Sequence, residues 1–160
     1  MWAILAGLGI WGGLVLWVIA TDLGRAAVIV PLLMLTATFE VSFFIHTGVE
    51  RVGRYLQVYY EEASDAAAPI GGWETTVMRY GTKFPGGLDP LFIRLFGFAA
   101  VLNFVCTFPV AVPHPGWAAV SLVAHVGLAW RFLTTRRQSS AQRATDLERF
   151  RALKTSSASN

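Results

Sequence analysis

The chain is poor in charged residues and almost devoid of cysteine. Asp, Glu, Lys and Arg make up 14% of its 160 residues, whereas soluble domains carry roughly 25%. The single cysteine, Cys106, has no second thiol with which to form an internal disulfide or a thiolate metal site. The nucleophile motif Gly-x-Ser-x-Gly, the zinc motif His-Glu-x-x-His and a phosphate-binding glycine loop are also missing. These absences count against an enzyme that uses one of those motifs.

What the chain has in abundance is apolar sequence, 54% of the total, gathered into blocks. Four blocks approach the roughly 20 residues that a helix needs to cross the hydrocarbon of a membrane. They are residues 2–20, 26–46, 91–112 and 116–133. The first block has no Lys or Arg before it and ends in a poor cleavage site, so we interpret it as a retained span rather than a signal peptide. This composition predicts an integral membrane protein.

Lys and Arg are distributed unevenly around the four blocks. The connection between the first two blocks holds only Arg25, and the "PHPG" connection between the last two holds none. Apart from Arg94 and Arg131 inside the last two blocks, the remaining basic residues lie in residues 47–90 and in the basic tail, residues 136–160. By the positive-inside rule, both termini and the 47–90 loop are expected in the cytoplasm, and we expect the membrane to be a bacterial inner membrane. The basic residues are not accompanied by aromatic residues that would form a nucleic-acid-binding surface with them, so no nucleic-acid partner is expected.

The predicted fold is all-α. Short connections make sequential helices antiparallel neighbours, so residues 1–135 are expected to form a four-helix membrane bundle of two transmembrane hairpins. The second span should continue into the cytoplasm as a helical extension. A short interfacial helix is expected at "WETTVMRYG", with Trp73 and Tyr80 at headgroup level. The tail is expected to be partly disordered.

The second block contains a carboxylate, Glu40, among apolar residues. An isolated ionised carboxylate in lipid costs several kcal/mol, so such groups pair, protonate or face water. Counted along their helices from the cytoplasmic side, Arg94 in the third block and Arg131 in the fourth lie at nearly the same height as Glu40. We therefore predict that Glu40 contacts Arg94, Arg131 or both inside the bundle.

Further polar residues lie at helical spacing on the same face as Glu40. The expected cluster comprises Glu40, His46, Glu50, Arg51, Arg54, Arg94 and Arg131. It could be a structural ion cluster that fixes helix register, or its arginines could reach the headgroups and leave the acid protonated. It could also be a pocket for an anionic phospholipid or a lipid-linked phosphate, since arginine outnumbers carboxylate.

His46 and Glu50 lie four residues apart on one helix face. That spacing can hold a divalent metal or orient a general base. A solvated contact at the membrane boundary is the commoner outcome, and two ligands do not make a site. No metal is therefore predicted.

A further histidine, His125, lies near the middle of the fourth block between small residues. The string "SLVAHVGLAW" resembles the histidine segment of light-harvesting antenna polypeptides, whose chains have one span. That resemblance implies a tetrapyrrole ligand at His125. The alternative is a neutral histidine bonded to another helix, at Asn103 or Thr36.

These features favour a non-catalytic membrane subunit or accessory protein whose partners are other membrane subunits. The spacing of Gly9 and Gly13 allows close helix contact, either within the chain or with such a partner. One alternative is a small membrane enzyme or binding protein for a phosphorylated lipid that works at the charged cluster. Another is proton or ion conduction through Glu40.

Overall fold

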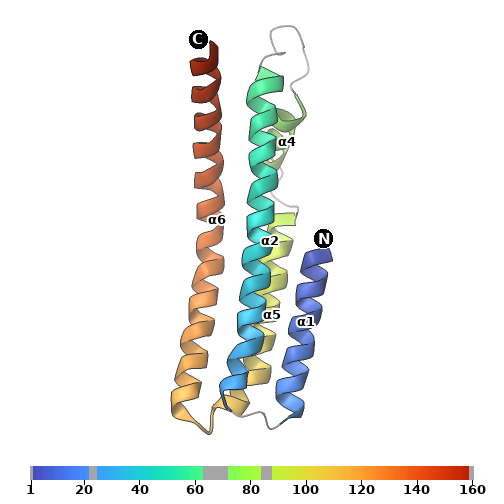
Figure 1. The fold of residues 1–160 in the computed structure, drawn as a ribbon, viewed down its shortest axis with the longest axis vertical. Coiled ribbons are helices and arrows are strands. Elements are labelled where there is room, and N and C mark those ends of the chain that lie inside the picture. The colour runs from blue at the N-terminus through green and yellow to red at the C-terminus, as the bar shows by residue number, and fades with distance from the viewer. Residues whose placement is uncertain (1, 22–24, 63–71, 84–87, 159–160) are drawn as a thin grey trace. The chain divides into compact units, whose positions relative to one another are not determined.

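The fold, in a computed structural model, is all-α within the described residues, which are 2–21, 25–62, 72–83 and 88–158. Four of the helices in these ranges are long and apolar enough to cross a membrane, as the sequence predicts. In chain order the elements are α1 (Trp2–Ala20), the 3-10 helix η1 (Arg25–Val28), α2 (Ile29–Leu56), the π-helix η2 (Gln57–Glu61), α4 (Trp73–Lys83), α5 (Leu88–Ala111) and α6 (Pro115–Ala158) (Figure 1).

The chain divides into two units. Unit 1 consists of Met1–Phe44 and Pro90–Thr134, and unit 2 consists of Ile45–Asp89 and Thr135–Asn160. Unit 1 contains the apolar parts of the four long helices, and unit 2 contains the polar parts of α2 and α6 together with α4.

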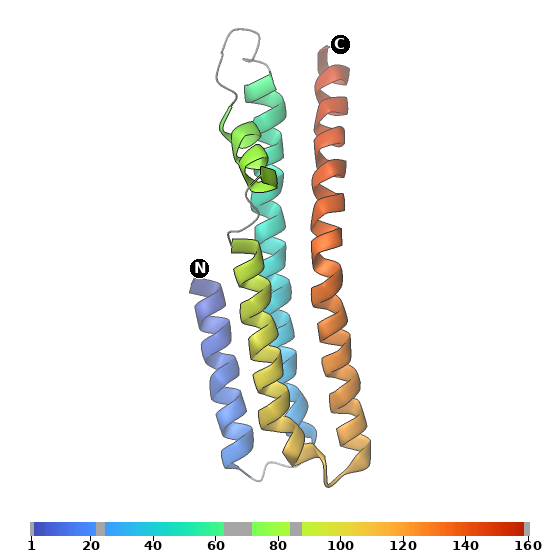
Figure 2. The ribbon, with the colours of Figure 1, turned by 180° about the vertical axis from the view of Figure 1, so that it is seen from behind.

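The long helices of unit 1 that follow one another in the chain run in opposite directions. The end of α1, η1, the end of α5 and the start of α6 gather at one end of the unit (Figures 1 and 2). There Val18, Val28 and Ala111 are buried together, and Trp117 packs against them. Because the chain reverses at this end twice, α2 and α6 run parallel to each other and antiparallel to α1 and α5.

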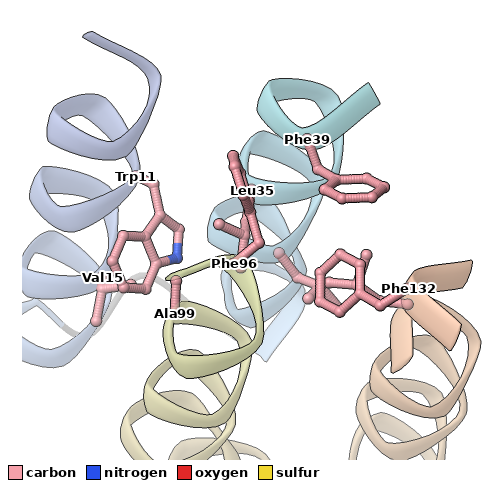
Figure 3. Packing of buried hydrophobic residues seen from close by; sticks show 9 residues of the cluster. Trp11, Val15, Leu35, Phe39, Phe96, Ala99 and Phe132 are labelled. Carbon is pink, nitrogen blue, oxygen red and sulfur yellow. The ribbon is translucent and has the colours of Figure 1, made fainter. Parts of the chain in front are cut away.

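The larger apolar cluster of unit 1 receives residues from all four long helices (Figure 3). Phe39 of α2 lies at its centre, with its ring centroid 5.3 Å from that of Phe96 on α5 and 4.6 Å from that of Phe132 on α6. Trp11 and Val15 close the cluster from α1. Lipid is as apolar as these side chains, so dispersion between interlocking rings, and not release of water, holds them together.

Large apolar side chains also cover the outside of the long helices. Exposed examples occur on all four, including Trp2, Leu16, Leu33, Phe44, Phe98, Val101, Val123 and Trp130. Several of the buried side chains are polar instead, including Thr38, Ser42, Asn103, Thr107 and Ser121. An apolar exterior around polar internal contacts is the pattern of helices in a bilayer, where internal polar groups must find partners.

α1 and α2 approach most closely at Gly7. A Cβ built at Gly7 would overlap the side chain of Thr38, whereas the positions of Gly9 and Gly13 face open space. The spaced glycine pair of the sequence is therefore not used within unit 1, and Gly7 makes the contact between these helices.

Gly7→Val should lower the free energy of unfolding by about 2 kcal/mol, because the added side chain must push α1 from α2 or force Thr38 off its rotamer. Reversible unfolding in mild detergent, followed by circular dichroism, measures this loss. Gly13→Ala is the matched control and should change stability by less than about 0.5 kcal/mol. Equal effects of the two substitutions would contradict the assigned contact.

The tail is more regular than the sequence suggested. The tail, expected to be partly disordered, continues α6 as one helix to Ala158. Residues 138–158 contain no Gly or Pro, and they extend an existing helix without a new nucleation step. The short helix expected at "WETTVMRYG" is present as α4, which ends at Lys83.

Candidate functional site

Glu40 and Arg131 form an ion pair between α2 and α6 in unit 1. Arg131 Nε donates to Glu40 Oε1 over 2.7 Å, and Arg131 Nη2 donates to Glu40 Oε2 over 2.9 Å. Two parallel bonds fix both the distance and the rotation of the two side chains, which a lysine could not do. The expected contact between Glu40 and an arginine of another helix is therefore present.

Two aromatic rings of α2 also contact the guanidinium group of Arg131. The guanidinium carbon of Arg131 lies 5.0 Å from the ring centroid of Phe43 and 5.8 Å from that of Phe39. Phe39 is also the centre of the apolar core. Cation–π attraction in a site with little water contributes to holding the arginine against α2.

Arg94 does not join the pair. Its side chain is exposed on α5, and among the described residues it forms no ion pair. Height along a helix and rotation about its axis are independent, so an arginine at the counted height of Glu40 need not face it. In unit 1 the structure therefore brings together two of the three residues expected to converge.

A second polar contact in unit 1 links three helices in a row. The indole Nε1 of Trp11 on α1 donates to Asn103 Oδ1 on α5 over 3.0 Å. Asn103 Nδ2 lies 3.0 Å from Nε2 of His125 on α6, and His125 Nδ1 lies 2.7 Å from the carbonyl oxygen of Ser121. Asn103 is one of the two partners that the sequence proposed for this histidine.

The groups at the two ends of this network determine which atoms in it donate hydrogen bonds and which accept them. An indole N–H can only donate, so the Asn103 oxygen accepts and its amide nitrogen donates to His125. A carbonyl can only accept, so His125 Nδ1 carries a proton and Nε2 is the acceptor. A protonated imidazole would place two donors face to face at Nε2, so the network requires a neutral ring.

The same network bears on the tetrapyrrole interpretation. A metal ligand needs a free ring nitrogen, and both ring nitrogens of His125 lie at hydrogen-bond distance from groups of the chain. Ligation through Nε2 would have to break the bond to Asn103 and leave the Asn103 amide N–H without its acceptor. The geometry supports a structural histidine.

In unit 2, His46 and Glu50 make a contact of 3.4 Å between Nε2 and Oε1. Glu50 also accepts bonds from Arg143 and from Ser139 of α6. Nowhere in the described part of the chain do three or more His, Cys, Asp or Glu side chains meet in a group that could hold a metal ion. Glu50 is thus committed to joining α2 to α6.

Further ion pairs join the parallel helices of unit 2 with alternating polarity. Arg51 Nε of α2 donates to Asp146 Oδ2 of α6 over 3.1 Å, and Arg151 Nη2 of α6 donates to Glu62 Oε1 over 2.6 Å. From α2 to the residue after η2, the paired side chains are therefore an acid, a base and an acid, namely Glu50, Arg51 and Glu62, and their partners on α6 carry the opposite charges.

α4 is held against α2 and η2 by two acidic side chains (Figures 1 and 2). Glu74 of α4 accepts a 2.9 Å bond from the buried Arg54. Glu61 caps the start of α4, because its carboxylate accepts bonds from the backbone N–H groups of Glu74 and Thr75 and from the Thr75 hydroxyl. These groups have no partner within the helix, and a carboxylate also suits the positive end of its dipole.

Glu61→Ala should loosen the start of α4. The loss of a carboxylate cap costs about 1 kcal/mol, so amide exchange within residues 73–83 should accelerate about fivefold. Hydrogen–deuterium exchange with mass spectrometry on the detergent-solubilised chain measures this rate. Glu148→Ala removes the same charge from an exposed position of α6 and should leave the rate unchanged. Equal exchange in both variants would show that Glu61 is not the cap.

Sequence reasoning missed several of these residues. Trp11, Glu61, Arg143 and Asp146 were not among the candidates, although Arg143 and Asp146 pair with two that were, Glu50 and Arg51. The contact between Trp11 and Asn103 could have been predicted from their positions along the helices. Trp11 lies about as far from the α1–α2 connection as Asn103 lies from the α5–α6 connection. Matching heights had been applied only to charged residues.

No protein-family model matches the chain, and neither a curated protein nor a solved structure is similar to it.

Proposed function

We propose that the chain is a non-catalytic subunit or accessory protein of a larger membrane complex. Its fold would be a four-helix membrane bundle of two hairpins, with both termini and the polar parts of α2 and α6 in the cytoplasm of a bacterial cell. The alternating directions of the helices in unit 1 and the basic residues beside the polar ends of α2 and α6 support this topology.

One observation carries the proposal, namely that the charged residues are paired with one another. Glu40, Glu50, Arg51 and Arg54 each bind a side chain of opposite charge on a different helix. A catalytic site or an anion pocket would leave such groups turned toward a substrate. Here they join helices, while the apolar exterior offers surface to lipid and to other spans.

Purification tests the proposal directly. The chain, tagged at its C-terminus and expressed in its native membrane, should co-isolate in mild detergent with other membrane polypeptides in a fixed ratio. Quantitative mass spectrometry of the purified material measures that ratio. If the chain purifies without any other polypeptide and remains stable, it is not a subunit of a hetero-oligomeric complex.

A second candidate function, binding of a phosphorylated lipid, is favoured by Arg94. This arginine is exposed near the start of the third apolar span, and among the described residues it forms no ion pair. A guanidinium in that position suits a lipid phosphate. Proton conduction through Glu40 has less support, because the carboxylate would first have to leave Arg131.

Arg94→Gln tests the lipid-binding candidate. A charge-assisted bond to phosphate is worth about 1.5 kcal/mol or more, so affinity for an anionic phospholipid should fall about tenfold. Native mass spectrometry of the chain with added phosphatidylglycerol measures the affinity. Arg79→Gln, in α4, removes the same charge elsewhere and serves as the control. An unchanged affinity in Arg94→Gln would remove lipid binding at this residue from consideration.

A further inference from the structure

The ion pair of unit 1 is open on one side. Glu40 keeps 43% of its side chain exposed and Arg131 keeps 27%, although both lie in apolar spans. A carboxylate can accept about four hydrogen bonds, and the two from Arg131 occupy half of that capacity. Charge left open to acyl chains costs several kcal/mol, so we expect a further polar group, beyond those that the described residues supply, over the open side.

The surface around Glu40 has the pattern of a helix-packing seam. Leu33, Ala37, Glu40 and Phe44 follow one another at spacings of four, three and four residues, and we call them the α2 seam. This spacing places them on one stripe of the helix, as in coiled coils. Leu33 is 62% exposed, Phe44 is 79% exposed and Ala37 is exposed. The seam is therefore apolar except at Glu40 and is uncovered over its length.

Small residues beside the ion pair leave room for a second backbone. Ala37 lies one turn before Glu40 on α2, and Gly127 lies one turn before Arg131 on α6. A Cβ built at Gly127 would meet no atom within 4 Å. In membranes such small residues allow neighbouring helices to approach closely.

We propose that a second copy of this chain covers the α2 seam, in a dimer with a twofold axis. The ion pair presents a negative group and a positive group side by side, so it is complementary to itself. A twofold axis would place Glu40 of each copy against Arg131 of the other, so each copy completes the polar contacts of its neighbour. The proposal rests on the proposed function, since it names the chain itself as one partner in the complex.

A lipid headgroup fits this place less well. His46 is six residues beyond Glu40, so a phosphate at the polar boundary would have to descend about 9 Å past the exposed Phe44. It would also meet the carboxylate, the more exposed member of the pair. The self-complementary arrangement satisfies both charges at their own depth.

Disulfide trapping tests the proposal with both charges intact. In a Cys106→Ser background, Ala37→Cys and Phe44→Cys place thiols on the α2 seam, and Phe98→Cys places one on α5 as an equally lipid-exposed control. Oxidation of the full-length chain in native membranes, followed by non-reducing electrophoresis, should give a dimer from at least one seam variant. The α5 control should stay monomeric. Trapping that is absent at both seam positions, or equal at the control, overturns the proposal.

A charge swap tests the pairing itself. Glu40→Arg and Arg131→Glu, carried on two differently tagged copies, should each dimerise poorly alone. Co-expressed, they restore opposite charges across the twofold axis, so their co-purification should exceed self-association of either about tenfold. No excess in correctly inserted variants overturns the proposal. If the variants fail to insert, the disulfide experiment decides.

The two proposals fail separately. A trapped dimer that purifies without other polypeptides supports the α2 seam and removes the hetero-oligomeric complex. Other polypeptides in fixed ratio to a chain that cannot be trapped support the complex and remove the seam.

Discussion

Arg131→Met should lower the free energy of unfolding by about 2 kcal/mol. The substitution leaves the Glu40 carboxylate without its partner in an apolar span, and breaking a fully buried pair costs about 3–5 kcal/mol. The value is reduced here because both side chains are partly exposed. Unfolding of the chain in detergent, followed by circular dichroism over a denaturant series, measures the loss.

The double variant separates pairing from packing. Glu40→Leu combined with Arg131→Met removes both charges and keeps much of the apolar volume, so it should recover most of the stability lost in the single variant. Arg94→Gln is the matched control, because Arg94 is exposed and should contribute less than about 0.5 kcal/mol. If the double loss equals the sum of the two single losses, the two side chains are not coupled.

Asn103→Leu should also lower the free energy of unfolding by about 2 kcal/mol. Leucine keeps the volume of the buried Asn103 but leaves the Trp11 indole N–H and the His125 Nε2 without partners. Each unpaired buried group costs about 1–3 kcal/mol, and polar contacts between membrane helices fall toward the lower end of that range. The same detergent unfolding measurement applies.

Trp11→Phe tests whether the loss in Asn103→Leu comes from the hydrogen bond to Trp11. Phenylalanine keeps a ring in the core and removes the indole donor, so Asn103→Leu should be less damaging in that background than in the native chain. Thr107→Val is the control, because the Thr107 hydroxyl donates only to the carbonyl of Asn103 in its own helix. Valine there should cost less than about 0.5 kcal/mol. Equal losses for Asn103→Leu in the two backgrounds would show that Trp11 is not part of the network.

The sequence predicted much of unit 1 because two of its constraints act along one dimension. Membrane thickness sets the length of an apolar block, so the four long helices were expected near their observed positions. Height along a helix is a count of residues, and it matched Glu40 to Arg131, which form an ion pair. Rotation about the axis is set by packing on all sides, so the count of residues could not decide between Arg94, Arg131 or both as the partner of Glu40.

Unit 2 could not be predicted in the same way. The tail has little apolar periodicity, so nothing in it showed that α6 continues beside α2. Its structure depends on pairs such as Arg51 with Asp146 and Glu62 with Arg151, which are far apart in sequence. Those contacts become apparent only when two helices are known to run parallel, because any arginine of the tail could otherwise have been matched to any acid of the loop.

The alternating polarity of the ion pairs in unit 2 limits how its two parallel helices can move. If α6 slid along α2 by one turn in one direction, Asp146 would come opposite Glu50. In the other direction Arg143 would come opposite Arg51. Both displacements replace attraction with repulsion, so a piston stroke of one helix past the other is disfavoured. A conformational change could then pass along α2 and α6 only if the two helices bend together, or if they separate progressively from their C-terminal ends.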